Sequence, residues 1–296
     1  MDLFAQFGLQ ELLARAGLTD FLSHYSLPWL LGLVAALLLT GIVAGLLAGL
    51  LGVGGGIVIV PVLYHLFTLL GVDPEVRMHV AVGTSLATII PTSIISARSH
   101  RKRGSLDRQL LRSLIPSVLV GVVIGAVASH WLSGNVLTSV FAAIALLVAA
   151  NMGLRKESLQ LGNQLPGAVG SSLIGSGIGG FSTLMGIGGG TLSVPILSAF
   201  KTPMHVAVGT GAALGMVISL PGAIGFLING LDVANRPPFT VGYINLAGLA
   251  LIVPMTMLLA PYGAKLAHSV DARRLRQLFA LFLSLTALRM FYGLMS

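Results

Sequence analysis

The chain has 296 residues, of which 55% are hydrophobic and only 9% charged, and its formal net charge is +8. A soluble domain carries about 25% charged residues, so this composition excludes a water-soluble fold and indicates a membrane protein. Cysteine is absent, which excludes disulfides and thiolate sites, and the basic residues gather beside apolar segments, which argues against nucleic acid as a partner.

The first 27 residues are predicted to form an amphipathic segment on the membrane surface. Glu11, Arg15 and Asp20 interrupt its apolar residues. The segment also lacks the basic start and clean apolar run of a cleavable signal peptide. We therefore expect the membrane-embedded part to begin near residue 28.

Ten helical segments are expected after this region, five in each half. A membrane-spanning helix needs about 20 mostly apolar residues. The first membrane repeat, 28–154, contains segments at 28–51, 56–71, 79–98, 109–132 and 135–154. A cytoplasmic linker at 155–165 precedes the second repeat, 166–296, with segments at 166–186, 190–200, 205–229, 241–266 and 273–294. Two segments, 56–71 and 190–200, are too short to cross comfortably and directly follow glycine clusters, which is typical of re-entrant or broken helices.

The two halves share three sequence blocks in the same order, which indicates an internal duplication. GVGGG at 52–56 matches GIGGG at 186–190, and Pro61 matches Pro195. The run MHVAVGT occurs identically at 78–84 and 204–210. At one constant offset, four further residues match: Gly104, Pro116, Gly125 and Met152 correspond to Gly242, Pro254, Gly263 and Met290.

Basic residues predict the orientation of the halves, because short cytoplasmic loops are rich in Lys and Arg. The loops at 98–112 and 265–276 are basic and are therefore expected in the cytoplasm. Counting segments from these loops places the amino terminus outside and the central linker inside. The predicted fold is an all-α polytopic membrane protein with two inverted-topology repeats of about five helical segments each, containing glycine-broken or re-entrant hairpins.

The paired glycine clusters predict a binding site. Glycine-interrupted segments at matching positions of two inverted halves mark the substrate site in many transporters. A helix that begins after such a cluster directs its positive end at the interruption, which favours an anion. Close helix packing is the alternative role of these glycines. The candidate substrate-binding residues are Gly52, Gly54, Gly55, Gly56, Thr84, Ser85, Gly186, Gly188, Gly189, Gly190 and Thr210.

The few charged and titratable residues in the spans also favour an anion. None of the nine acidic residues lies deep within a predicted span, whereas cation or proton coupling usually requires an intramembrane carboxylate. His79 and His205 occupy equivalent positions and could bind an anion, carry a proton in coupled transport, or cap helix ends at the interface. Arg98 and Arg289 lie near segment ends, where their side chains are expected to reach the headgroups.

The repeated motifs resemble those of the TauE/SafE sulfite exporter family, also called the TSUP permeases. Each G-x-G-G-G segment has a proline five residues after its last glycine and precedes a His-x-x-x-Gly-Thr run, and the resemblance extends from about residue 41 to 294. It implies a polytopic permease for sulfite, sulfonates, sulfoacetate or related sulfur oxyanions. It also implies roles for the glycine motifs and for Gly83–Thr84 and Gly209–Thr210. The second copy departs from the first in having Gly211 where the first has Ser85.

We therefore expect a multi-pass transporter of the bacterial inner membrane that exports a small sulfur-containing anion. An anion channel and a proton-coupled uptake permease are the alternatives. An intramembrane enzyme is disfavoured, since the sequence has neither cysteine nor a G-x-S-x-G nucleophile motif with a partnered histidine. The expected partners are the anion and membrane lipid, without nucleic acid, metal or cofactor. A homodimer is compatible with the sequence, which does not determine the oligomeric state.

Overall fold

The computed structural model describes residues 26–52, 54–154, 162–266 and 272–295, which are almost entirely helical. The first half contains α3 (Leu27–Leu51), α4 (Gly56–Leu69), α5 (Pro74–Lys102), α6 (Arg108–Ala128) and α7 (Gly134–Leu154). The second half contains α8 (Ala168–Met185), α9 (Gly189–Ala199), α10 (Met204–Asn229), α11 (Leu246–Leu266) and α12 (Ala272–Met295). Between α10 and α11, the strands β1 (Thr240–Val241) and β2 (Ile244–Asn245) form a short antiparallel hairpin.

The surface and interior of this helical bundle suit a lipid environment. Within the described residues, α3, α5, α6, α7, α10 and α11 are each long and apolar enough to cross a membrane. Large apolar side chains such as Leu31, Val120 and Leu285 are exposed. No Arg, Lys, Asp or Glu is buried among the side chains that the structure describes. These features confirm the prediction of an all-α polytopic membrane protein.

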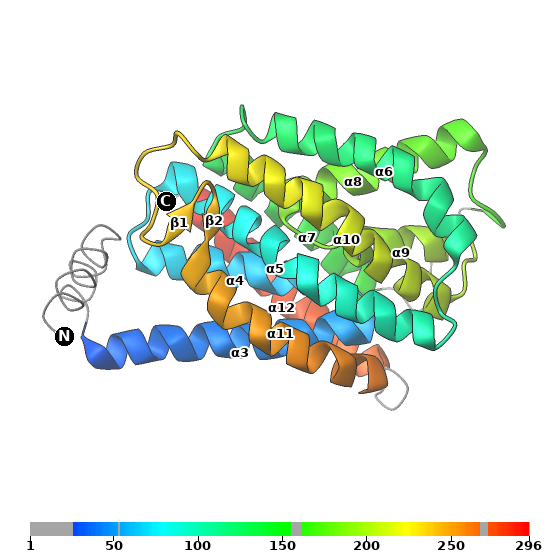
Figure 1. The fold of residues 1–296 in the computed structure, drawn as a ribbon, viewed down its shortest axis with the longest axis horizontal. Helices are drawn as coiled ribbons and strands as arrows, with labels where there is room; N and C mark the ends of the chain where they lie inside the picture. The colour runs from blue at the N-terminus through cyan, green and yellow to red at the C-terminus, as the bar shows by residue number, and fades with distance from the viewer. Residues whose placement is uncertain (1–25, 53, 155–161, 267–271, 296) are drawn as a thin grey trace, which may run out of the picture.

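The helices of the two halves pack against one another rather than forming two separate bundles (Figure 1). Helix α3 of the first half lies along α11 of the second, and α6 lies along α8. The equivalent helices α5 and α10 cross at the centre, and α7 packs on α12. The most extensive helix–helix packing therefore joins one half to the other.

The central helices α5 and α10 run in opposite directions. Gly209, near the start of α10, lies against the backbone of Ser105, just beyond the end of α5. At the other end of the pair, Ser129 links the two helices. The Asn229 side chain, at the end of α10, donates to Ser129 Oγ at 3.1 Å, and Nε2 of His79, near the start of α5, lies 3.2 Å from Ser129 O. Equivalent segments of the two halves are thus oppositely oriented at the centre of the molecule. The inverted topology of the complete halves in a membrane stays a prediction.

Equivalent residues also begin and end the neighbouring helices. The Asp107 side chain accepts from the N–H groups of Gln109 and Leu110 at the start of α6, and Asn245 Oδ1 accepts from Gly248 N at the start of α11. Such N-caps satisfy donors that have no partner within the helix.

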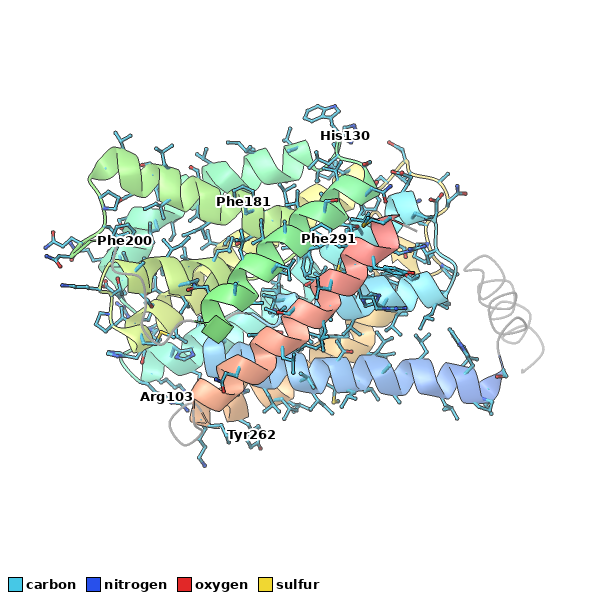
Figure 2. The ribbon with its side chains drawn as sticks, turned by 180° about the vertical axis from the view of Figure 1, so that it is seen from behind. Arg103, His130, Phe181, Phe200, Tyr262 and Phe291 are labelled. Atoms are coloured by element: carbon cyan, nitrogen blue, oxygen red, sulfur yellow. The ribbon has the colours of Figure 1, made fainter. Side chains whose placement is uncertain are left out.

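The last carbonyls of α6 and α11 receive donors from the ends of the central helices. Asn229 of α10 donates to Ala126 O of α6 at 2.8 Å, and Arg103, which follows α5, donates to Ala264 O of α11. These contacts fix both ends of the α5–α10 pair. Figure 2 shows Arg103 far from His130, which follows the end of α6.

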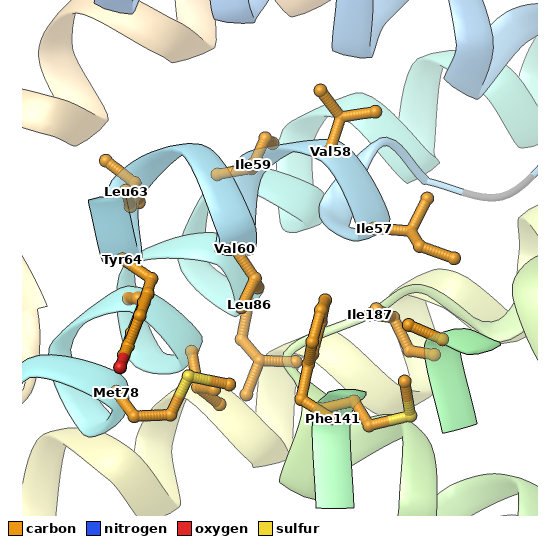
Figure 3. Close-up of a cluster of buried hydrophobic side chains, with 14 of the residues drawn as sticks. Ile57, Val58, Ile59, Val60, Leu63, Tyr64, Met78, Leu86, Phe141 and Ile187 are labelled. Carbon is orange, nitrogen blue, oxygen red and sulfur yellow. The ribbon is translucent and has the colours of Figure 1, made fainter. Parts of the chain in front are cut away.

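The short helix α4 lies in the apolar core (Figure 3). Its residues Ile57 and Val60 are fully buried, together with Leu86 of α5 and Phe141 of α7. Ile187, from the glycine turn of the second half, belongs to the same cluster. The core therefore anchors α4 directly beside the second glycine turn.

The predicted segments agree with the observed helices except at a few ends. Helix α5 begins at Pro74, where Asp73 caps it, and is therefore longer than the predicted segment 79–98. The prediction of helix from residue 241 was wrong, because residues 240–245 form the β1–β2 hairpin, in which Gly242 has a φ of 57°. Residues 1–25 of the predicted surface segment and residues 155–161 of the predicted linker lie outside the described part of the chain.

Candidate functional site

The first glycine turn interrupts the path of the chain between α3 and α4. Gly52 ends α3 in the left-handed conformation with a φ of 65°, and Gly54 and Gly55 also have positive φ values, 75° and 79°. Residues with a β-carbon rarely adopt this backbone conformation, so the turn requires glycine. Helix α4 then extends for 14 residues. Its length is about 21 Å, which is too short for a hydrocarbon core of about 30 Å.

The second glycine turn, between α8 and α9, repeats this arrangement. Gly186 ends α8 with a φ of 65°, and Gly188 is the N-cap of α9. Helix α9 has 11 residues, and its length is about 17 Å. Both halves therefore contain a helix that is broken at the glycine cluster and resumes as a short buried helix.

The two glycine turns meet inside the bundle. A β-carbon added at Gly54 would lie 3.1 Å from the Cα atom of Gly188, and one added at Gly56 would collide with the carbonyl oxygen of Gly186. Because Gly55 and Gly188 are the N-caps of α4 and α9, the N-terminal ends of both short helices are brought to one place. The structure thus unites the glycines that the sequence predicted as a site.

Each glycine turn also contacts the MHVAVGT segment of the other half. A β-carbon at Gly52 would lie 2.6 Å from the carbonyl oxygen of Val208, and one at Gly186 would lie 2.8 Å from the Cα atom of Val82. Val82 and Val208 are equivalent residues of the repeat. The glycines therefore allow close helix packing as well as breaking the helices, and the two roles coexist at the same residues.

The three predicted hydroxyl residues have different surroundings. Thr84 Oγ1 accepts from the backbone N–H of Asn245 at 2.8 Å, and Ser85 Oγ donates to the carbonyl of Gly186 at 2.6 Å. Ser85 therefore joins α5 directly to the second glycine turn. Thr210 is fully buried, and its hydroxyl has no hydrogen-bond partner.

The structure does not bring the two predicted histidines together. Nδ1 of His79 lies 3.0 Å from Glu75 O, and its Nε2 lies within 3.2 Å of the carbonyls of Ser129 and Leu132. The His79 ring stacks on Tyr243 at 4.8 Å, and burial raises the pKa of the Tyr243 hydroxyl above its ordinary value. His205 is exposed at the start of α10. Since α5 and α10 run in opposite directions, the two histidines lie at opposite ends of the pair.

Several buried hydroxyls that sequence reasoning did not select have no partner. These hydroxyls belong to Ser182, Thr191, Ser193 and Ser219, and they lack a partner as the predicted Thr210 does. All of these residues lie in the second half. A comparison of equivalent positions could have revealed part of this set, because Thr191 and Ser193 correspond to Ile57 and Ile59 of the first half.

The fold and the buried glycine turns define the chain as a polytopic helical membrane protein with broken helices at its centre. The chain matches the family described as Sulfite exporter TauE/SafE over residues 37–290. This match covers most of the chain. The protein therefore belongs to the TauE/SafE family and is a membrane transporter.

Curated relatives carry the same general description. A probable membrane transporter protein of Haemophilus influenzae is 34% identical over 254 residues, which cover 86% of this chain and 96% of that protein. A probable membrane transporter protein of Methanocaldococcus jannaschii is 26% identical over 262 residues, covering 87% of this chain and 95% of that protein. No solved structure matches the chain significantly.

Proposed function

We propose that this transporter exports a small sulfur-containing anion, such as sulfite or an organosulfonate, across the bacterial inner membrane. The substrate binds where the two glycine turns meet, and transport involves no covalent chemistry on the anion. The family description as a sulfite exporter supports the substrate class.

The observation that carries this proposal is the meeting of two helix N-termini in the buried interior. The first N–H groups of a helix have no partner within it, and the helix dipole places partial positive charge at the same end. Gly54 and Gly188 bring the starts of α4 and α9 together, so both ends can act on one anion. Glycine also lets a ligand approach the backbone closely.

The distribution of acidic residues supports an anionic substrate. The described acidic side chains Asp73, Glu75, Asp107 and Asp232 all lie at helix ends or in connections, outside the glycine turns and outside α4 and α9. Among the described residues, no carboxylate therefore belongs to the elements that form the proposed site, where it would repel an anion.

Counterflow in proteoliposomes tests this function. Vesicles that contain the purified protein and unlabelled sulfite, methanesulfonate or sulfoacetate should accumulate the same labelled anion transiently, and protein-free vesicles should not. Transport of none of these anions would contradict the proposal. Flux that neither saturates nor responds to substrate on the far side would favour an anion channel. Uptake that requires an imposed proton gradient would favour a proton-coupled permease.

A further inference from the structure

The two short helices differ in what lies before their N-terminal ends. Ile89 of α5 and Gly215 of α10 are equivalent residues. The Ile89 side chain covers the first glycine turn, since β-carbons at Gly54 and Gly56 would lie 3.3 Å and 2.7 Å from its atoms. At the second turn, the equivalent Gly215 has no side chain, and a β-carbon there would lie 3.1 Å from Ser93 Cβ and 3.9 Å from Cγ2 of the same Ile89. A β-carbon at Gly215 would lie 3.7 Å from the backbone nitrogen of Gly189, the first residue of α9.

Helix α9 points its N-terminal end along α10 toward Ser219. Ser193, one turn into α9, lies beside Gly211, whereas Gly189, at the start of α9, packs against Leu214 and has its nitrogen 3.7 Å from a β-carbon built at Gly215. Moving toward the start of α9 therefore means moving toward the C-terminal end of α10. Ser219 follows Gly215 by four residues and shares its face. Because side chains lean toward the N-terminus of their own helix, the Ser219 hydroxyl leans toward Gly215 and the start of α9.

The hydroxyls of Ser193 and Ser219 are both 0% exposed and have no hydrogen-bond partner. The equivalent residues of the first half leave no hydroxyl unpaired. Ile59, the counterpart of Ser193, has no polar side-chain atom, and Ser93, the counterpart of Ser219, donates its Oγ–H to Ile90 O at 3.1 Å. Buried polar groups in proteins are nearly always paired, and unpaired groups suggest a bound molecule or a functional role. The unpaired serines of this site therefore lie only in the second half.

The charge on a ligand at this site is limited by its surroundings. Among the described side chains no Arg or Lys is buried, so only hydroxyl and N–H dipoles are available to an anion. The desolvation cost of an ion rises steeply with its charge, and neutral dipoles offset less of it than a cationic side chain does. A site of this kind accepts a single negative charge more readily than two.

On the basis of the proposed function, we infer that the start of α9, flanked by Ser193 and Ser219, binds the oxygen atoms of a singly charged oxyanion such as a sulfonate. The first N–H groups of α9 and the two hydroxyls donate to the sulfonate oxygens. The first glycine turn, which Ile89 covers, contributes packing and its helix dipole. The transporter thus has one oxyanion site rather than two symmetric ones.

Calorimetric binding of methanesulfonate to the purified full chain tests this inference. Ser193→Ala and Ser219→Ala should each weaken binding by about tenfold or more, the usual effect of losing a hydrogen bond to a charged group. The thermal stability of both variants should be unchanged or raised, because each removes an unpaired buried hydroxyl. Gly215→Ala, whose β-carbon would lie 3.1 Å from Ser93 Cβ beside the start of α9, should also weaken binding.

A matched control is Thr138→Val, because Thr138 is buried but its hydroxyl donates to Gly134 O of its own helix at 2.8 Å. It should bind methanesulfonate like the wild type. Wild-type affinity in all three site variants would overturn the inference while leaving the proposed function intact. Equally tight binding of sulfate and methanesulfonate would have the same consequence. If the wild type binds neither methanesulfonate nor sulfite, the inference and the proposed function both fail.

Discussion

His79 connects the ends of two helices at one side of the molecule. Its ring nitrogens lie within hydrogen-bond distance of the Glu75 carbonyl in α5 and of the Ser129 and Leu132 carbonyls beyond the end of α6. Carbonyls at a helix C-terminus have no partner within the helix, so a side-chain donor there stabilises the turn. The equivalent His205 is exposed and has a different environment.

We predict that His79→Ala lowers the stability of the protein and that His205→Ala does not. A neutral imidazole has one N–H donor, and its loss leaves at least one of these carbonyls without that side-chain donor, which costs roughly 1–3 kcal/mol. Thermal unfolding of the two variants in detergent measures the difference. Equal melting temperatures would contradict the structural role of His79. A coupling role of the pair stays a prediction, and it requires the pH dependence of transport to change in both variants.

At the scale of single residues, the sequence predicts glycines better than hydroxyls. The glycines of the two clusters stand out because both copies keep them, and the structure places them together. Ser193 and Ser219 resemble any helical serine in the sequence, because whether a hydroxyl is paired depends on neighbours that only the fold supplies. Gly215 is likewise informative only beside Ile89, its counterpart at the crossing of α5 and α10.

At the scale of elements, the broken helices were predictable because glycine clusters precede segments too short to span a bilayer. The β1–β2 hairpin was not. Its sequence, TVGYIN at 240–245, has no charged residue and runs directly into the apolar helix that follows. The hairpin depends on the left-handed Gly242 and on Asn245, whose side chain bonds Pro238 O and Thr240 Oγ1. These contacts become apparent only in three dimensions.

The ends of the central helices lead to a prediction about membrane orientation. Arg103 donates to Ala264 O, so the exposed residues Lys102 and Lys265 lie at the same end of the bundle. Basic residues at this end predict that it faces the cytoplasm. Single cysteines are informative because the native chain has none. Lys102→Cys and Lys265→Cys should react with a membrane-impermeant maleimide only from the cytoplasmic side.

His130→Cys provides the opposite control, because His130 is exposed beyond the end of α6. It should react only from the outside. Labelling of Lys102→Cys and Lys265→Cys from different sides would contradict the packing of Arg103 on α11. Labelling of all three positions from one side would contradict the predicted membrane orientation of the helices.

At the scale of the whole molecule, the absence of buried charge among the described residues leads to a prediction about energetics. An inside-negative potential favours the exit of an anion by about 2.3 kcal/mol per charge per 100 mV. This free energy corresponds to roughly a fiftyfold concentration ratio for a monovalent anion. We predict that efflux of sulfite from proteoliposomes accelerates when valinomycin and a potassium gradient make the interior negative, without a proton or sodium gradient.

The control for this experiment is the same vesicle with equal potassium on both sides and an imposed pH gradient. Efflux should then proceed at its basal rate. Efflux that ignores the membrane potential but stops when the pH gradient is dissipated would contradict electrogenic export. It would also make His79 and His205 the first residues to examine as proton carriers.

The reciprocal contacts of Gly52 with Val208 and of Gly186 with Val82 have a consequence for biosynthesis. The first glycine turn leaves the ribosome long before Val208 is made, an interval of roughly 8–30 s at 5–20 residues per second. Throughout that interval, the newly inserted first half lacks the helices α10 and α11 on which α3 and α5 pack. The nascent chain must therefore wait in the bilayer with an incomplete interior, and translation of the second half sets the earliest time at which this transporter can fold.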